Sequence, residues 1–163
     1  MKIAIANDHR GFKLKTKLIK YLTKKGHEVI NVGTNSESSV DYPTYAFLLG
    51  DQIASGECEL GIAICGSGIG ISIACNKVKG IRCAKVNNVK EAKYSRIDND
   101  ANIVALSGNM PYFRALDIID TFINTKHLMI DRHDKRINMI TEYENTSKRK
   151  PIKKKDDLDW YDI

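Results

Sequence analysis

The chain has 163 residues, of which 42% are hydrophobic, so it is long enough for one well-packed core and short for two domains. Its net charge is +6, but residues 147–163 hold six Lys or Arg against four Asp, which leaves +4 on residues 1–146. Because those basic residues are spread along helix-like stretches without aromatic partners, the charge does not indicate nucleic-acid binding.

The start of the chain and its apolar runs bear on its location. The first residues read as a strand and not as a signal peptide, and no apolar run approaches the length of about 18 residues that a membrane span needs. The sequence therefore predicts a cytoplasmic protein without membrane contact. The cysteines (58, 65, 75, 83) and histidines (9, 27, 127, 133) have neither C-x-x-C nor zinc-finger spacing, so we expect no disulfide framework and no metal site.

The first half of the chain predicts strands and helices in alternation. A helix is indicated where Leu14, Leu18 and Leu22 recur every four residues, and Gly26 is placed to end it. The expected elements are strand 2–7, helix 10–25, strand 27–33, loop 34–42, helix 43–55 beginning at a proline, and strand 59–65. A turn with glycines at 66, 68 and 70, called the glycine turn below, follows and leads into a helix that ends at about residue 77.

The second half continues the alternation. It predicts strand 81–86, helix 88–96, strand 102–108, a helix after Pro111 marked by Phe113, Leu116, Ile119 and Ile123, and a last helix from about Arg132 with Ile137, Ile140 and Tyr143 on its apolar side. This order is typical of a single-domain, Rossmann-like, doubly wound α/β fold with a five-stranded parallel sheet and helices on both faces. We expect the domain to cover residues 1–146 and the charged residues 147–163 to form a mobile tail.

The segment "CGSGIG" (65–70) follows a buried strand at the edge where such folds collect their functional loops. Its glycines stand at 66, 68 and 70, which is neither the dinucleotide fingerprint nor a Walker A loop, so NAD and nucleotide binding are disfavoured. Small residues at a helix start let backbone N–H groups converge on negative charge, and a thiol there loses its proton more readily. Cys65 is thus a candidate acid–base group beside an oxyanion hole, against the alternative of an inert core cysteine.

Three further polar clusters have both a functional and a structural interpretation. Asp8 and His9 end the first strand at the same sheet edge, where Asp8 is also suited to cap a helix. Arg132 and Arg136 stand one helical turn apart, which fits either a phosphate grip or a solvated basic face. The stretch 98–102 is rich in Asp and Asn, as an ordinary turn would be.

Taken together, these segments resemble a known family. "DH" at 8–9, "DYP" at 41–43, "CGSGIGISIACNK" at 65–77, "GIR" at 80–82, "SR-x-x-NDAN" at 95–102 and "RH-x-x-R" at 132–136 are similar to the motifs of the RpiB/LacA/LacB sugar-phosphate isomerases. The resemblance runs from residue 2 to about 144 and implies reversible isomerisation of ribose 5-phosphate to ribulose 5-phosphate through a cis-enediolate, as in the non-oxidative pentose phosphate pathway. It implies no metal and no cofactor.

The resemblance also implies roles for individual residues. Cys65 would carry the proton between C1 and C2, and Ser67 would help move protons between the enediolate oxygens. The residues that would contact the substrate are Asp8, His9, Tyr42, Asn99, and Gly66, Gly68, Ile69 and Gly70 through backbone amides. Arg132 and Arg136 match phosphate-binding arginines that reach a site at a dimer interface, which implies a homodimer and leaves a tetramer open.

Two positions depart from the family pattern. Asp98 stands where the family has the histidine that opens the sugar ring, and a carboxylate is a poor proton donor near neutral pH. Asn109 stands where the family often has a phosphate-contacting arginine, for which Arg10 is a candidate substitute. These departures leave open a sugar-phosphate-binding protein with impaired catalysis. A six-carbon aldose 6-phosphate isomerase also stays open, because a sequence does not show the depth of a pocket. A flavin-binding protein is disfavoured, because "NDHRGF" lacks the hydroxyl residues that wrap a flavin phosphate.

Overall fold

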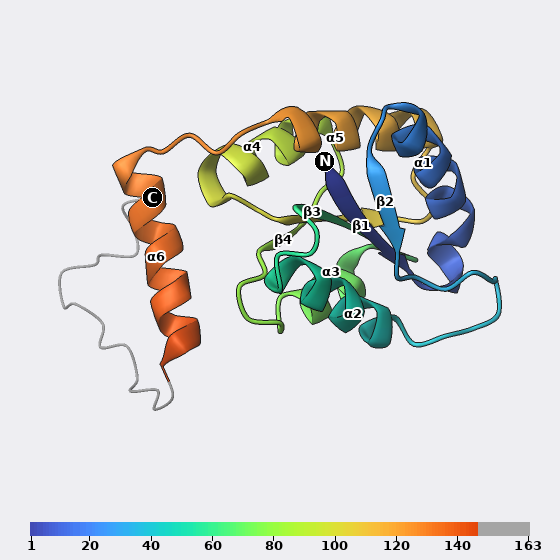
Figure 1. Ribbon diagram of the computed structural model, residues 1–163, viewed down its shortest axis with the longest axis horizontal. Coiled ribbons are helices and arrows are strands. Elements are labelled where there is room, and N and C mark those ends of the chain that lie inside the picture. Colours follow the sequence, from blue (N-terminus) through green and yellow to red (C-terminus); the bar gives the residue numbers. More distant parts are fainter. Residues whose placement is uncertain (147–163) are drawn as a thin grey trace, which may run out of the picture.

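The computed structural model describes residues 1–146, and the tail expected at 147–163 lies outside the described residues. Five parallel strands form one sheet in the order β2-β1-β3-β5-β4 (Figure 1). The strands are β1 Lys2–Asn7, β2 Glu28–Asn31, β3 Leu60–Cys65, β4 Cys83–Lys85 and β5 Ile103–Ser107. The chain leaves β1 towards β2 on one side and returns to β3 on the other, so the crevice between β1 and β3 is the switch point where open α/β sheets bind ligands.

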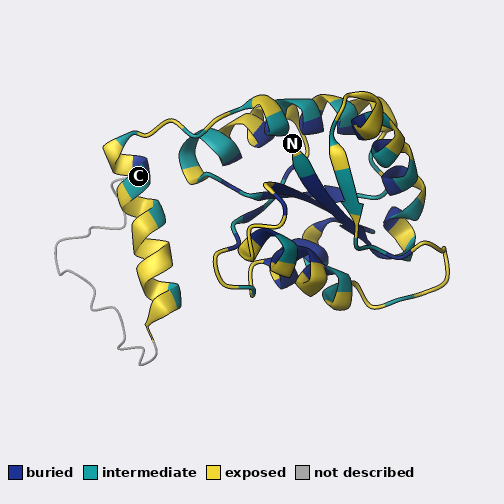
Figure 2. Ribbon diagram, viewed as in Figure 1, coloured by how far each residue is buried: buried dark blue, intermediate teal, exposed yellow. Residues whose placement is uncertain are grey.

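Helices cover both faces of this sheet, which confirms the expected fold class. They are α1 Phe12–Lys24, α2 Tyr42–Ala54, α3 Ile69–Cys75, α4 Val89–Asn99, α5 Tyr112–Asn124 and α6 Asp131–Asn145, with a short 3-10 turn at His9–Gly11. Alternate strand residues face opposite ways: Ile3 and Ile5 lie in the core under α1, α4 and α5, whereas Ala4 and Ala6 lie in the core under α2 and α3. The strands at the middle of the sheet are buried along almost their whole length (Figure 2).

Two helices differ in detail from the expectation. In α5 the buried residues are Ala115, Ile118, Ile119 and Phe122, while Phe113 is 66% exposed at the start of the helix. In α6 only His133 is buried, and the apolar side expected from Ile140 and Tyr143 is about half exposed because this helix stands off the sheet (Figure 1). No helix within residues 1–146 is long and apolar enough to cross a membrane.

Candidate functional site

Three loops meet at the carboxyl-terminal ends of β1, β3 and β5. The Asp8 N–H donates to the Ile64 carbonyl at 3.0 Å, and the Gly108 N–H donates to the Cys65 carbonyl at 2.8 Å. The Ser107 hydroxyl donates to the Gly66 carbonyl at 2.8 Å. These bonds bring "NDHRG", "CGSGIG" and "LSGNMP" to one place at the switch point of the sheet, as their positions after strands predicted.

Cys65 ends β3 and its side chain is buried. Its sulfur accepts a hydrogen bond from the Gly68 N–H at 3.2 Å. Gly68 has φ +78°, and a Cβ there would lie 2.8 Å from the Leu106 carbonyl carbon, so the turn that aims this N–H at the sulfur requires glycine. This hydrogen bond fixes the sulfur beside the glycine turn, at the carboxyl-terminal end of β3.

The side chains of Tyr42 and Arg10 lie against the other two glycines of the turn. A Cβ on Gly70 would lie 2.7 Å from the Tyr42 ring, and a Cβ on Gly66 would lie 2.9 Å from the Arg10 side chain. Tyr42 is partly exposed at the first residue of α2, so its ring forms one wall beside the turn. The Ser67 hydroxyl accepts from the Ile69 N–H at 3.2 Å, so this side chain helps to hold the turn.

Asp8 and His9 sit at the other side of the crevice. One Asp8 carboxylate oxygen accepts from the N–H groups of Arg10 and Gly11, at 2.9 and 3.1 Å, so the capping role suggested by the sequence is present. His9 Nδ1 accepts from the Val40 N–H at 3.2 Å, which leaves the ring proton of a neutral imidazole on Nε2. A cavity of about 320 Å³ opens here, lined by His9, Arg10, Lys13, Glu37, Gly108 and Asn109.

The remaining expected site residues form a second cluster on α4 and α6. Asp98 and Asn99 are the last residues of α4, and Asp98 Oδ1 lies 3.7 Å from Nε2 of the buried His133. Arg132 and Arg136 stand one turn apart on α6, both exposed, with Arg132 next to His133 in the chain. Residues 132 and 136 therefore share a face of a real helix, as the sequence predicted.

Two side chains for which the sequence predicts no role, His127 and Asp134, attach α6 to α4. His127 Nδ1 lies 2.8 Å from the Ile97 carbonyl, and Nε2 lies 2.6 Å from an Asp134 carboxylate oxygen. The hydrogen bond with Asp134 raises the pKa of His127, opposed by burial. His127 lies in the linker between α5 and α6, 30 residues from Ile97 and 7 from Asp134. No sequence pattern therefore singles out this contact.

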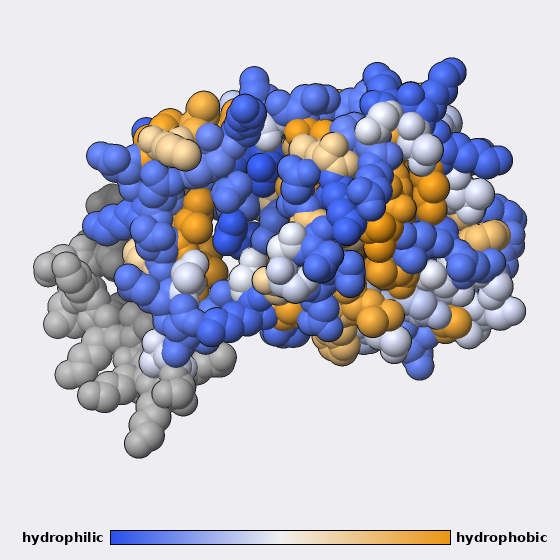
Figure 3. Space-filling model, viewed as in Figure 1, coloured by the Kyte–Doolittle hydropathy of each residue, from blue (hydrophilic) through white to orange (hydrophobic). Residues whose placement is uncertain are grey.

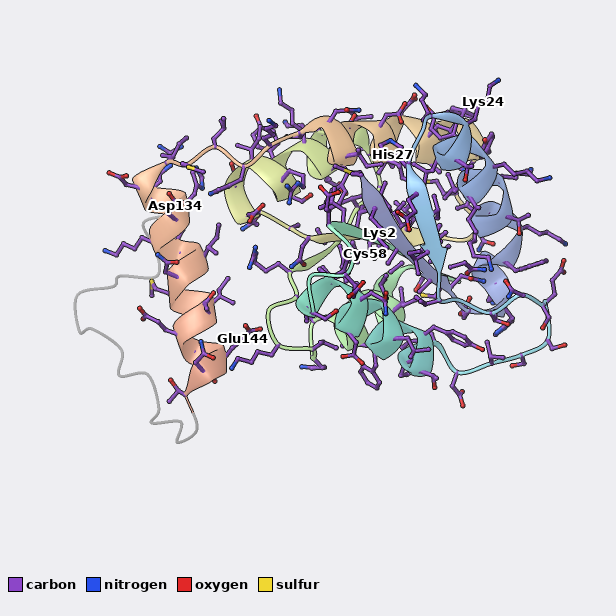
Figure 4. The ribbon with its side chains drawn as sticks, in the orientation of Figure 1. Lys2, Lys24, His27, Cys58, Asp134 and Glu144 are labelled. Carbon is purple, nitrogen blue, oxygen red and sulfur yellow. The ribbon has the colours of Figure 1, made fainter. Side chains whose placement is uncertain are left out.

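The two clusters lie at opposite edges of the sheet. The Gly61 N–H donates to the Asn102 carbonyl at the amino-terminal edge, just after α4, whereas Cys65 pairs with Ser107 at the carboxyl-terminal edge. A strand rises about 3.3 Å per residue, so the four residues from Gly61 to Cys65 separate the edges by roughly 13 Å. Figure 4 labels Lys2 and Cys58 near the amino-terminal edge, and Asp134 and Glu144 on α6. One copy of the chain therefore does not bring Arg132 or Asp98 to Cys65.

The other three cysteines lie in the core and not at the site. Cys58, Cys75 and Cys83 are buried and free, as expected of core cysteines, and the hydrogen bond with Cys75, together with burial, raises the pKa of Cys83. Residues 1–146 contain no cluster of three His, Cys, Asp or Glu side chains suited to a metal ion.

Comparison with known proteins supports an interpretation of this geometry. Residues 3–140 match the family model described as "Ribose/Galactose Isomerase". The chain is 36% identical to ribose-5-phosphate isomerase B of Mycolicibacterium paratuberculosis over 93% of this chain and 97% of the relative. It is 38% identical to galactose-6-phosphate isomerase subunit LacB of Clostridium acetobutylicum, over 87% of this chain and 83% of that one.

A solved structure of a relative has the same fold. Ribose-5-phosphate isomerase B of Clostridium thermocellum superposes with a TM-score of 0.86 and 46% identity, covering 88% of this chain and 97% of that chain. The residues matched by the family model include the glycine turn, the loop after β1 and most of α6.

Proposed function

Because the chain belongs to the ribose/galactose isomerase family, we propose that it is an aldose–ketose isomerase that interconverts D-ribose 5-phosphate and D-ribulose 5-phosphate. The observation that carries the proposal is the buried Cys65 sulfur that faces the Gly68 N–H at the end of β3, in the crevice beside β1. The chemistry is an internal transfer in which C1 gains the hydrogen that C2 loses, so it needs no external oxidant or reductant.

The Cys65 thiolate acts as the base. It takes the proton from C2 of the open-chain aldose, the electron pair forms the enediolate double bond, and the same proton returns to C1 to give the ketose. Backbone N–H groups of the turn stabilise the negative oxygens, which is where fixed donors contribute most. In the structure, the Gly68 and Ile69 N–H groups donate to Cys65 and Ser67, so the substrate oxygens take their place as acceptors or use the other N–H groups of residues 66–70. The Ser67 hydroxyl moves a proton between those oxygens, and Tyr42 closes the wall of the site.

The rest of the substrate is held by side chains on both sides of the crevice. Asp8 and His9 contact the sugar from the first loop, with His9 donating through Nε2. Asn109 and Arg10 line the same cavity as His9, which supports Arg10 as a cation for the phosphate in place of the arginine expected at position 109.

The second cluster enters the site from another copy of the chain. Arg132 and Arg136 of the partner subunit bind the phosphate, and the partner subunit's Asn99 binds the sugar. Exposed apolar side chains support a homodimer: Leu48 and Ile73 on α2 and α3, and Met139 and Ile140 on α6, where hydrophobic residues come to the surface (Figure 3). A tetramer and a cytoplasmic location remain predictions from the sequence.

Ring opening is assigned to Asp98 of the second cluster. A carboxylate accepts the O1 proton but is a poor donor to the ring oxygen, and the imidazole of His133 at 3.7 Å supplies a second group for that proton. Asp98 and His133 together thus do the work that the family pattern gives to one histidine.

The test is an isomerase assay on ribose 5-phosphate. We expect turnover by the unaltered protein, and a loss in kcat of at least about a hundredfold in Cys65→Ala, because the base is removed. Cys58→Ala is the matched control, since Cys58 is also buried but lies before β3 at the opposite edge. Equal activity of the Cys65 and Cys58 variants would overturn the mechanism, and absence of turnover by the unaltered protein would favour a binding protein.

A six-carbon substrate is the second candidate, because one relative is named a galactose-6-phosphate isomerase subunit. The same assay with allose 6-phosphate and galactose 6-phosphate separates the two. Higher kcat/KM on a six-carbon sugar than on ribose 5-phosphate would replace the first assignment by the second.

A further inference from the structure

The ammonium group of Lys15 is buried in an unusual way. Lys15 lies in the first turn of α1, is 1% exposed, and has no carboxylate partner within residues 1–146. Its Nζ instead donates to the Thr34 carbonyl at 2.7 Å and to the side-chain oxygens of Asn35 and Asn31 at 2.9 and 3.2 Å. Three acceptors match the three protons of an ammonium group, so every donor is used.

Burying a charge without a counter-ion is unfavourable, and here it lowers the pKa of Lys15. A helix that only had to cover the sheet would place an apolar residue at this position, as it does at Leu14, Leu18 and Leu22. The ammonium group must therefore make a contact that a leucine or methionine cannot make. All three of its hydrogen bonds go to residues 31–35, so it fixes that segment against α1.

That segment begins the loop between β2 and α2. It is packed closely against the end of β1: the Thr34 N–H donates to the Asn7 carbonyl at 3.2 Å, and a Cβ on Gly33 would lie 2.0 Å from the Asn7 side-chain oxygen. Asn7 is the residue before Asp8, so the loop that Lys15 holds lies directly against the first catalytic loop.

The far end of the same loop reaches His9. The Val40 N–H donates to His9 Nδ1 at 3.2 Å, and Glu37 lines the cavity together with His9. Glu37 also pairs with Lys13 at 3.2 Å, but both side chains are largely exposed, so this ion pair holds the loop more weakly than the buried hydrogen bonds of Lys15 do. The position of the loop thereby decides which imidazole nitrogen of His9 carries the proton.

We propose that Lys15 is a positioning residue for the sugar-binding site: by holding residues 31–35 it fixes the loop whose Val40 N–H keeps the Nε2–H of His9 directed at the substrate. The proposal deepens the proposed function and rests on it for the substrate. Its structural part, the link from Lys15 to the tautomer of His9, holds with or without turnover.

The experiment compares Lys15→Met with Lys20→Met, an exposed lysine on the same helix. Imidazole nitrogen NMR of the full chain without substrate is the first measurement, with the His9 signals identified by their loss in His9→Gln. We expect well-separated Nδ1 and Nε2 shifts for His9 in the unaltered protein and in Lys20→Met, and shifts that move towards an exchanging average in Lys15→Met. A purely structural lysine would leave the tautomer unchanged.

Kinetics are the second measurement. We expect KM for ribose 5-phosphate to rise about tenfold in Lys15→Met while kcat falls less, because the binding contact is misplaced and Cys65 is not. Lys15→Arg, which keeps the charge and the donors, should recover part of both effects. Unchanged His9 shifts in Lys15→Met would refute the proposal even if the protein is less stable.

A variant that does not touch the core covers the case in which Lys15→Met fails to fold. Asn35→Ala removes one acceptor from an exposed loop residue and should move the His9 shifts and KM in the same direction by a smaller amount. If the unaltered protein shows no turnover but the His9 shifts behave as expected, the proposed function is refuted and the positioning role of Lys15 is not.

Discussion

The chemistry assigned to Cys65 depends on one backbone N–H. The sulfur and the Gly68 N–H are 3.2 Å apart because Gly68 adopts a left-handed conformation that places the amide under the thiol. The residue types and their order already indicated an acid–base thiol beside an anion hole. The alternative of an inert cysteine is less favoured by the geometry, because Cys58, Cys75 and Cys83 have no comparable donor aimed at them from a glycine turn.

The residue at position 98 should limit how fast the sugar ring opens. Ribose 5-phosphate in water is mostly a closed furanose, and a histidine donates a proton to the ring oxygen near neutral pH more readily than a carboxylate does. We therefore expect Asp98→His to raise kcat/KM on the equilibrated sugar by about tenfold. The measurement is the initial rate with sugar at anomeric equilibrium.

Asp117→His is the control for this change, because Asp117 is exposed on α5 away from both clusters. An unchanged rate in Asp98→His would mean that Asp98 does not limit ring opening. The assignment of ring opening to Asp98 would then be wrong.

At the scale of elements, the attachment of α6 to α4 depends on His127. Its hydrogen bond with Asp134 raises the pKa of His127 above the usual 6.5, so the folded state binds the proton more tightly than the unfolded state. The resulting stabilisation is complete below pH 6.5 and is lost as the pH rises through the raised value.

We accordingly expect His127→Gln to lower Tm at about pH 6 more than at about pH 9, with a difference of about 3 °C or less because the pair is partly solvated. Thermal unfolding of both proteins at the two pH values measures it. His27→Gln serves as the control histidine. An equal loss at both pH values would show that the charge of His127 has no part in holding α6.

The elements were predicted well where periodicity is strong. Strand 2–7 matches β1, and the leucine-spaced helix is α1, because burial on one face imposes the pattern. Helix α4 extends past the expected residue 96 to Asn99 and ends at Asp100, whose φ is +43°. The Asp100 carboxylate there pairs with Arg96 one turn before it and with Arg82, and the contact with Arg82, 18 residues earlier in the chain, is not visible in local spacing.

At the scale of the whole molecule, the separation of the two clusters makes a prediction about assembly. If each site takes Cys65 from one chain and Arg136 from the other, then Cys65→Ala and Arg136→Ala are each inactive alone. A heterodimer of the two has one site with both residues intact. Random exchange in an equimolar mixture should therefore restore about a quarter of the unaltered activity.

The measurement is turnover after the variants are mixed and exchanged, with oligomeric state followed by light scattering. A mixture of Cys65→Ala with Cys65→Ala/Arg136→Ala is the control, since no combination of these chains gives an intact site. Failure of the first mixture to recover activity, while exchange is observed, would place both residues in the same chain's site.

The residue pattern predicted the parallel α/β fold and the position of three loops at one end of the sheet, and the structure confirms both. The pattern could do so because strand and helix periods, glycine spacing and residue type are local properties. The acid–base role of Cys65 stays a prediction. Three features became visible in the folded chain and not in the sequence: Asp98 and Arg132 lie at the opposite end of the sheet from Cys65, His133 stands beside Asp98, and Lys15 donates to the loop that follows β2. Each of these rests on contacts between residues distant in the chain, whose geometry is set by how the helices pack and not by the residues around them.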